Sequence, residues 1–83
     1  MNFDVIWTSA AEQELADLWL DPAIRNEVTT ASHTLDQQLQ ANAPNVGESR
    51  PNGRRIAFET PLGILFRIDP PGNVVRVLHV WRI

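Results

Sequence analysis

The chain has 83 residues, of which 43% are hydrophobic, and its formal net charge at pH 7 is −3. One small domain over residues 1–83 accounts for this length, and the apolar fraction excludes a wholly disordered chain. There is no cysteine, so a disulfide framework and a cysteine-ligated zinc site are both excluded.

The first half of the chain predicts one strand and two helices. Residues 3–7 alternate at roughly period two, as a short strand does. Ser9-Ala10-Ala11-Glu12 has the pattern of a capping box, which predicts a helix that begins at Ser9. Asp21-Pro22 predicts the start of a second helix that ends near residue 41. The apolar sector of this second helix contains Ile24, Val28, Ala31, Leu35 and Leu39.

The second half predicts three strands. After a break at 42–47, residues 54–60 and 62–69 alternate at period two, and residues 70–73 form a strong turn signal before a last strand at 74–83. The order is βααβββ. Because two helices return the chain to the end from which it left, we expect the second strand to run antiparallel to the first. The predicted fold is α+β, a four-stranded antiparallel sheet with a helical hairpin packed on one face.

Alternation also assigns the strand side chains to two faces. We expect Ile56 and Phe58 to pack on the helices, together with Leu62, Ile64, Phe66 and Ile68 of the next strand and Val75, Val77, His79 and Trp81 of the last one. The helix-free face then carries a candidate partner-binding set: Arg55, Arg67, Arg76, Arg82, Leu65, Leu78 and Val80. Arginines that frame aliphatic side chains are typical of protein interfaces. Both faces of residues 74–83 are largely apolar, so a register shift by one residue stays open.

Charge separates the two halves of the chain. Residues 1–49 carry one arginine and eight acidic residues, whereas residues 50–83 carry six arginines and two acidic residues. The formal charges of these segments are therefore −7 and +4. A local basic patch binds a polyanion or an acidic partner, whatever the net charge of the whole chain. The C-terminal strands are thus the first place to look for function.

The order and spacing of these segments resemble the RelE/ParE superfamily, the toxins of bacterial type II toxin–antitoxin systems. The opening Val5-Ile6-Trp7-Thr8 is similar to that family's first strand, and Leu35-Asp36 with Leu39 to its second helix. The closing strands of the family are similar to three segments: Gly53-Arg54-Arg55-Ile56, Leu65-Phe66-Arg67-Ile68 and residues 75–82. The resemblance implies a bacterial toxin of the plasmid-stabilisation type whose partner is a cognate antitoxin.

The RelE-like branch consists of ribosome-dependent mRNA endoribonucleases, and most of its working residues have no counterpart here. That branch has an arginine at the start of the middle closing strand, where this chain has Gly63 or Leu62. It has an arginine and then a tyrosine or histidine at the C-terminal end, where this chain has Arg82 and Ile83 and no tyrosine. The candidate catalytic residues that remain are Arg54, Arg55, Arg67, His79 and Arg82.

The ParE-like branch lacks that catalytic set and acts on DNA gyrase by protein contact. Its last strand commonly has an apolar residue, a histidine, two further residues and an arginine. Leu78-His79-Val80-Trp81-Arg82 fits this order. The resemblance therefore favours the ParE-like branch and a role in binding proteins, while enzyme activity stays open.

Three further residues have side chains that could take part in chemistry: His79, His33 and Glu48. His79 is the best single general-base candidate, although its parity places it with the core side chains. His33 lies opposite the apolar sector of its helix, so we expect it to be exposed. Glu48 is expected to cap its loop or to pair with an arginine. Two distant histidines without clustered carboxylates do not predict a metal site, and no cofactor is expected.

The sequence thus predicts a toxin, or a toxin relative that has lost toxicity, which binds proteins and is neutralised by an antitoxin. DNA gyrase is the target class that the resemblance implies. Two alternatives stay open: an mRNA endoribonuclease that works on the ribosome, and a non-toxic homo-oligomeric module such as a homodimer. With no signal-peptide pattern and no apolar run of membrane-spanning length, we expect a cytoplasmic location and no membrane partner.

Overall fold

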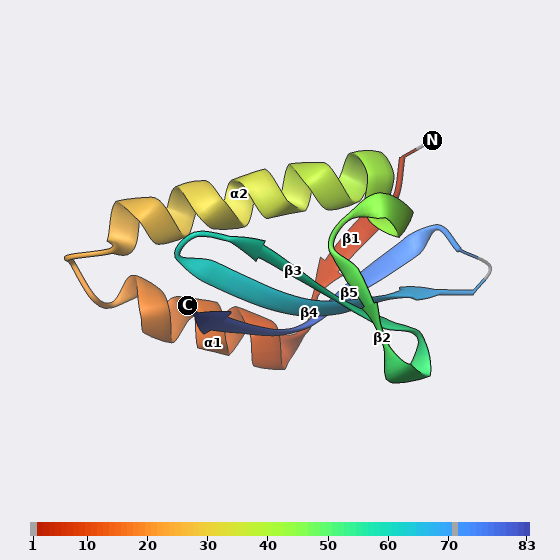
Figure 1. Cartoon of the computed structure of the whole chain (residues 1–83). Coiled ribbons are helices and arrows are strands. Elements are labelled where there is room, and N and C mark those ends of the chain that lie inside the picture. The colour runs from red at the N-terminus through yellow and green to blue at the C-terminus, as the bar shows by residue number, and fades with distance from the viewer. Residues whose placement is uncertain (1, 71) are drawn as a thin grey trace.

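A mixed five-stranded sheet and two helices make up the fold, so the α+β class is confirmed (Figure 1). The computed structural model describes residues 2–70 and 72–83. The elements in chain order are β1 (Asp4–Trp7), α1 (Ser9–Trp19), α2 (Arg25–Asn42), β2 (Glu48–Arg50), β3 (Arg54–Glu59), β4 (Leu62–Asp69) and β5 (Val74–Arg82), with short 3₁₀ turns at Ala43–Asn45 and Pro51–Gly53.

The sheet order is β1-β5-β4-β3-β2, and it corrects the prediction of four antiparallel strands. β1 pairs with β5 in parallel, and the other neighbours are antiparallel. The strand that the sequence did not predict is β2, which has only three residues. The first strand after the helical hairpin does run antiparallel to β1, but that strand is β2. Because β2 turns back into β3, the direction of every later strand is reversed relative to the prediction.

Helix α1 begins at Ser9 as predicted but has a different N-cap, and α2 begins later than predicted. Thr8, not Ser9, is the N-cap of α1, and its hydroxyl oxygen accepts a hydrogen bond from the Ala11 backbone N–H at 3.3 Å. α2 begins at Arg25 rather than at Pro22. Asp21 instead accepts a hydrogen bond from the Ala23 N–H at 2.9 Å and holds the turn between the two helices.

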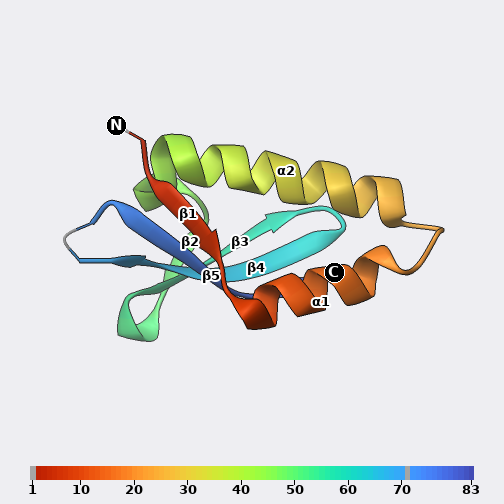
Figure 2. The same cartoon turned by 180° about the vertical axis from the view of Figure 1, so that it is seen from behind.

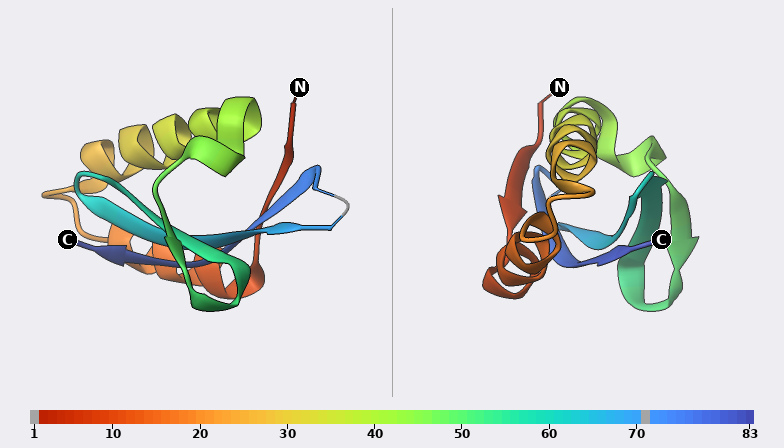
Figure 3. Two further views of the ribbon diagram at one scale, coloured as in Figure 1. Left: turned by 45° about the vertical axis from the view of Figure 1, so that its right-hand side comes forward. Right: turned by 90° about the vertical axis from the view of Figure 1, so that its left-hand side faces the viewer.

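The two helices occupy different places on the sheet. α2 lies over one face of the curved sheet, whereas α1 lies beside β5 (Figure 3). β1 passes directly into α1 at one side of the molecule (Figure 2). The core between α2 and the sheet contains Val28, Leu35, Leu39, Leu62, Ile64, Phe66, Val75 and Val77, all fully buried. Within the described residues, no helix has the length and apolar character needed to cross a bilayer.

Candidate functional site

The face of the sheet that points away from α2 carries three rows of side chains. Directly paired residues of neighbouring strands share a face, so the register defines each row. The first, the arginine row, consists of Arg50, Arg54, Arg67 and Arg76. The middle row consists of Glu48, Ile56, Leu65 and His79. The third row consists of Phe58, Gly63 and Trp81.

Strand β3 has the opposite face assignment from the one predicted. Ala57 is buried under α2, whereas Phe58 is 54% exposed on the helix-free face. The reason is space: a Cβ added to Gly47 would lie 2.9 Å from the Ala57 Cβ and 2.1 Å from the Ile56 carbonyl oxygen. Only a small side chain fits under the chain at this point, so the larger Ile56 and Phe58 face outward.

Arg55 consequently lies on the helix side and holds the chain that precedes β2. Its guanidinium donates hydrogen bonds to the carbonyl oxygens of Val46 and Gly47 and to the Ser49 hydroxyl, each at 2.9 Å. The predicted position of Arg55 on the helix-free face is therefore wrong. Its observed contacts are with its own chain.

Strand β5 changes faces part-way along. The register shifts between Leu65 and Phe66 of β4, where Leu78 is the extra residue of a bulge in β5. Val75 and Val77 face the core as predicted, but beyond the bulge it is Val80 that is buried. The prediction put His79 and Trp81 on the helix side, and Val80 and Arg82 on the helix-free face. Each of these four side chains lies on the opposite face from the predicted one. Leu78 itself has no paired residue opposite.

The bulge also decides where the last arginine lies. Arg82 is paired with the fully buried Leu62, so it extends from the helix side at the end of β5. Of the seven residues assigned to the helix-free face, Leu65, Arg67 and Arg76 lie there. Of the five catalytic candidates, Arg54, Arg67 and His79 share that face, whereas Arg55 and Arg82 lie on the other.

Acidic side chains neutralise only part of the arginine row. Asp69 forms ion pairs with Arg76 and with Arg67, whose Nε lies 2.9 Å from the Asp69 Oδ1. The hydrogen bond from Arg76, followed by the charge of Arg67, lowers the pKa of the Asp69 carboxyl below its ordinary value, although partial desolvation opposes the shift. Arg50 pairs with Glu48 at 3.3 Å. The exposed Arg54 has no side-chain hydrogen bond or ion pair within the described residues.

The third row forms an aromatic platform, defined here as Phe58 and Trp81 above Gly63. The Trp81 ring lies so close to Gly63 that an added Cβ would be 2.7 Å from the ring atom Cε2. Glycine is therefore required at this position to make room for the indole. The rings of Phe58 and Trp81 meet edge to face, with centroids 6.4 Å apart.

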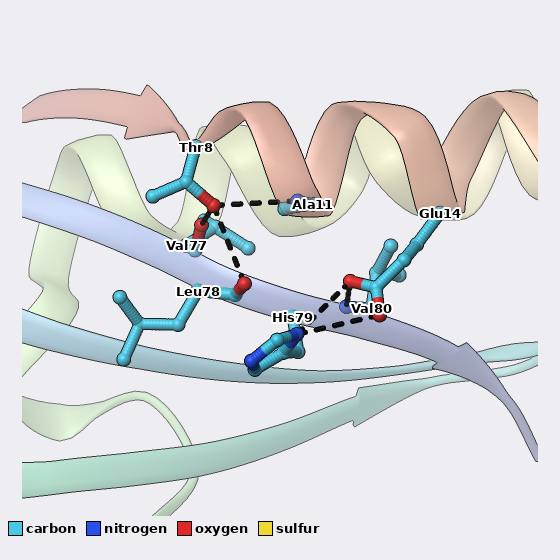
Figure 4. A network of polar contacts seen from close by, with 7 residues as sticks. All are labelled: Thr8, Ala11, Glu14, Val77, Leu78, His79 and Val80. Atoms are coloured by element: carbon cyan, nitrogen blue, oxygen red, sulfur yellow. Dashed lines mark hydrogen bonds and ion pairs between the residues drawn. The ribbon is translucent and has the colours of Figure 1, made fainter.

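At the edge of the middle row, His79 contacts α1 (Figure 4). Its Nδ1 lies 3.2 Å from a carboxylate oxygen of Glu14, and the same carboxylate accepts a hydrogen bond from the Val80 backbone N–H at 3.2 Å. Among the described residues, β1 pairs with Val74–Val77 alone, so this part of β5 has no described strand partner on that side. Glu14 thus bonds to an edge that the sheet leaves open.

The opposite side of the molecule has two adjoining grooves between the helices. One groove, of about 710 Å³, lies between β1 and the two helices and is bordered by Glu12, His33 and Asp36. The second, of about 350 Å³, is more apolar and is bordered by Leu15, Trp19 and Val28. His33 is exposed, as predicted. Among residues 2–70 and 72–83, no three histidine or carboxylate side chains gather as metal ligands.

A comparison of the sequence with family models assigns the chain to a family. The family model described as the ParE toxin of the type II toxin–antitoxin system, parDE, matches residues 5–82. This chain belongs to the ParE toxin family. A comparison with curated proteins found no match. The resemblance to a ParE-type toxin that was read from the sequence is thereby confirmed.

Solved structures share the ParE-like fold at low sequence identity. A chain of the RelBE2 toxin–antitoxin complex from Mycobacterium tuberculosis has a TM-score of 0.78 and 23% identity, over 100% of this chain and 93% of that one. The chromosomal ParDE system from P. aeruginosa gives 0.72 and 21%, over 98% and 96%. TrmO from Pseudomonas aeruginosa gives 0.65 and 16%, over 96% of this chain but 35% of that one. At these identities the likeness establishes the fold alone.

Several residues of the helix-free face were not predicted for it. Arg50 and Glu48 were missed because a three-residue strand gives no periodic signal. Phe58 and Trp81 were missed because uninterrupted alternation puts them on the helix side, and the contact at Gly47 and the bulge at Leu78 reverse that assignment. One signal was available: a glycine within an apolar strand marks close approach by another group, and at Gly63 that group is the Trp81 ring.

Proposed function

We propose that this ParE-family chain acts as a toxin by binding a protein target and is neutralised by an antitoxin protein. The observation that carries this proposal is the composition of the helix-free face. Four arginines lie beside the half-buried aliphatic side chains of Ile56 and Leu65 and the exposed ring of Phe58, and Arg54 has no side-chain partner within the described residues. Arginine, tryptophan and phenylalanine are enriched at protein interfaces, and tryptophan and arginine dominate their binding energy.

DNA gyrase is the target that the likeness to the ParE-like branch suggests. The support in this chain is the last strand, where Leu78, His79 and Arg82 occur in the family's order. The bulge at Leu78 separates these three side chains onto different parts of β5. The proposal therefore assigns binding to the helix-free face as a whole rather than to this short pattern.

The antitoxin is proposed to be an acidic protein that covers the basic side of the molecule. The solved ParDE and RelBE2 relatives are toxin–antitoxin systems, which supports such a partner. Residues 1–49 of this chain are acidic, and the larger groove is bordered by Glu12 and Asp36. An acidic segment is therefore repelled there and attracted by the arginine row. Co-expression with the neighbouring small reading frame, followed by affinity capture of the toxin, should recover the acidic protein, and its absence from the complex would contradict this part.

Messenger RNA cleavage is the competing activity, and the arrangement of its candidate residues gives it less support. RNA cleavage by attack of the ribose 2′-hydroxyl on the phosphate needs three groups close together. These are a base for the hydroxyl, a cation for the phosphate and an acid for the leaving oxygen. Arg55 and Arg82 lie across the sheet from Arg54 and His79, so the five candidates do not converge. Two arginines and one histidine are left on the same face.

The decisive experiment is induced expression in a host that lacks the antitoxin, with growth, cellular mRNA and the DNA-damage response measured together. We expect growth arrest with intact mRNA by primer extension, and a DNA-damage response if gyrase is the target. Cleaved mRNA that becomes intact on Arg82→Ala would instead establish the endoribonuclease. Harmless expression would identify a non-toxic binding module, whose homo-oligomeric state is then measured by light scattering.

A further inference from the structure

The helix-free face separates its arginines from its aromatic side chains in a way that specifies a ligand. Along β4, Arg67 lies in the arginine row and Gly63 lies under the aromatic platform, four residues further toward the start of the strand. Four residues of a strand span about 13 Å. Between them lies Leu65, which has no charge and no polar group. A ligand that uses both ends must therefore place an anion and an apolar group about 13 Å apart.

The charged end attracts carboxylates. The arginine row has four guanidinium groups, and the acids paired with them are Glu48 and Asp69. Arg54 lies between Arg50 and Arg67 in the row and is exposed, with no ion pair within the described part of the chain. Its planar guanidinium can bind a carboxylate with two parallel hydrogen bonds. The row therefore keeps an excess of positive charge and one free guanidinium.

The other end is preorganised for an apolar side chain. The Trp81 ring is fixed over Gly63, and Phe58 meets it edge to face while remaining 54% exposed. Rings that are already held in place lose little conformational freedom on binding, so a side chain that covers them gains most of the burial energy.

A polypeptide fits this arrangement better than a nucleic acid does. A single strand of RNA that ran from the arginine row to the platform would place phosphates over Ile56 and Leu65, which offer neither a cation nor a donor. Glu48 in the same row would repel them. An extended peptide has no such regular charge, and four of its residues cover about 13 Å.

We propose that the helix-free face binds an extended acidic segment of a partner protein, with one apolar anchor residue about four positions from its carboxylates. The arginine row binds the carboxylates and the aromatic platform binds the anchor. This assignment rests on the proposed protein-binding function and identifies the partner segment that this function requires.

The test uses fluorescein-labelled synthetic peptides and the full chain. One 12-residue peptide has a leucine that lies four positions before a run of four glutamates. In the second peptide serine replaces the leucine, and in the third glutamine replaces the glutamates. A 12-nucleotide single-stranded RNA is the fourth probe. Fluorescence anisotropy at low salt should show the tightest binding for the first peptide, with each altered peptide weaker by about tenfold.

Matched variants locate the site on the protein. Arg54→Ala and Phe58→Ala should each weaken the first peptide by about tenfold. Arg82→Ala removes the same charge from the other side of the sheet, and Leu20→Ala removes an apolar side chain that is 67% exposed. Both controls should leave the affinity unchanged. All four side chains are exposed, so circular dichroism should show an intact fold in each variant.

Three results would overturn the assignment: tighter binding of the RNA, no binding of the first peptide, or equal effects of the control and face variants. Toxicity separates this failure from failure of the proposed function. If wild type, Arg54→Ala and Phe58→Ala all arrest growth with intact mRNA, this face is not the site but the protein-binding toxin stands. If the wild type is harmless without antitoxin, the proposed function itself is wrong.

Discussion

Gly63 and Trp81 form the contact on which the outer surface of the sheet most depends. The absence of a side chain at Gly63 lets the indole lie directly over the β4 backbone, where it meets the exposed Phe58. A large aromatic residue can thus be ordered on an outer face without being in the core. The same arrangement leaves apolar area open to a partner.

Gly63→Ala should displace the Trp81 ring, because its Cβ would lie 2.7 Å from the indole. We expect a loss of about 1–3 kcal/mol in the free energy of unfolding, typical of overpacking, measured by urea denaturation. In the Gly63→Ala, Trp81→Leu double variant the clash is absent. Its loss should be smaller than the sum of the two single losses, whereas simple additivity would contradict the direct contact.

Asp69 should make the free energy of unfolding depend on pH in the acid range. Its pKa is lowered in the folded state by Arg76 and Arg67, so its contribution is fully present above the unfolded pKa of about 3.9 and is lost as the pH falls through the lower folded value. Asp69→Asn should be less stable than wild type at pH 7 and should lose less stability between about pH 4 and pH 2.

The control for this prediction is Asp17→Asn, which removes a carboxylate from the exposed side of α1. Asp17 has no side-chain hydrogen bond or ion pair within the described residues. Its acid denaturation curve should follow that of the wild type. If Asp69→Asn loses stability with acid as steeply as the wild type does, the ion pairs of Asp69 do not contribute in solution.

At the scale of elements, the attachment of α1 to β5 depends on two polar side chains. Thr8 caps α1 and also donates a hydrogen bond to the Val77 carbonyl oxygen at 2.8 Å. One turn and a half further on, Glu14 bonds the Val80 N–H and contacts His79 (Figure 4). These contacts satisfy backbone groups of β5 beyond the end of β1.

Glu14→Ala should leave the Val80 N–H without its partner and cost about 1–3 kcal/mol of stability. Glu12→Ala is the control, because Glu12 lies two residues, about half a helical turn, nearer the start of α1 and has no side-chain hydrogen bond within the described residues. Its effect should stay within about 0.5 kcal/mol. Hydrogen exchange of the Val80 amide, measured by NMR, should become faster only in Glu14→Ala. Unchanged exchange there would contradict the contact.

Arg54 and Arg55 are neighbours in sequence with different roles. Arg55 bonds Val46, Gly47 and Ser49 on the helix side, so Arg55→Ala should lower the stability by about 1–3 kcal/mol. Arg54→Ala should leave the melting temperature unchanged and weaken partner binding. Calorimetry measures the stability of the two variants, and fluorescence anisotropy measures their affinity for the peptide. Equal losses of stability in Arg54→Ala and Arg55→Ala would contradict these separate roles.

The helices and the three long strands could be predicted because their periodicity extends over many residues. The buried side of α2 and the inward face of β4 are both as expected. Faces in β3 and β5 could not be predicted, because each depends on a contact distant in sequence. Ala57 faces inward because Gly47 lies close above it, and the bulge at Leu78 reverses the parity of the residues after it.

At the scale of the whole molecule, the sheet separates an acidic surface from a basic one. Acidic residues predominate in the segment that forms the two helices, while four of the six arginines in residues 50–83 form one row on the opposite face. The other two, Arg55 and Arg82, lie on the helix side. The charge split in the sequence thus corresponds to two sides of the sheet.

The central claim is that this helix-free face is the working surface of a protein-binding toxin. Its most direct test compares the growth of a host without antitoxin after induction of Arg54→Glu and of Arg82→Glu, at equal expression. Both changes reverse one exposed charge, but on opposite sides of the sheet. We predict that Arg54→Glu restores growth while Arg82→Glu still arrests it. Equal arrest by both variants, or relief by Arg82→Glu alone, would contradict the claim.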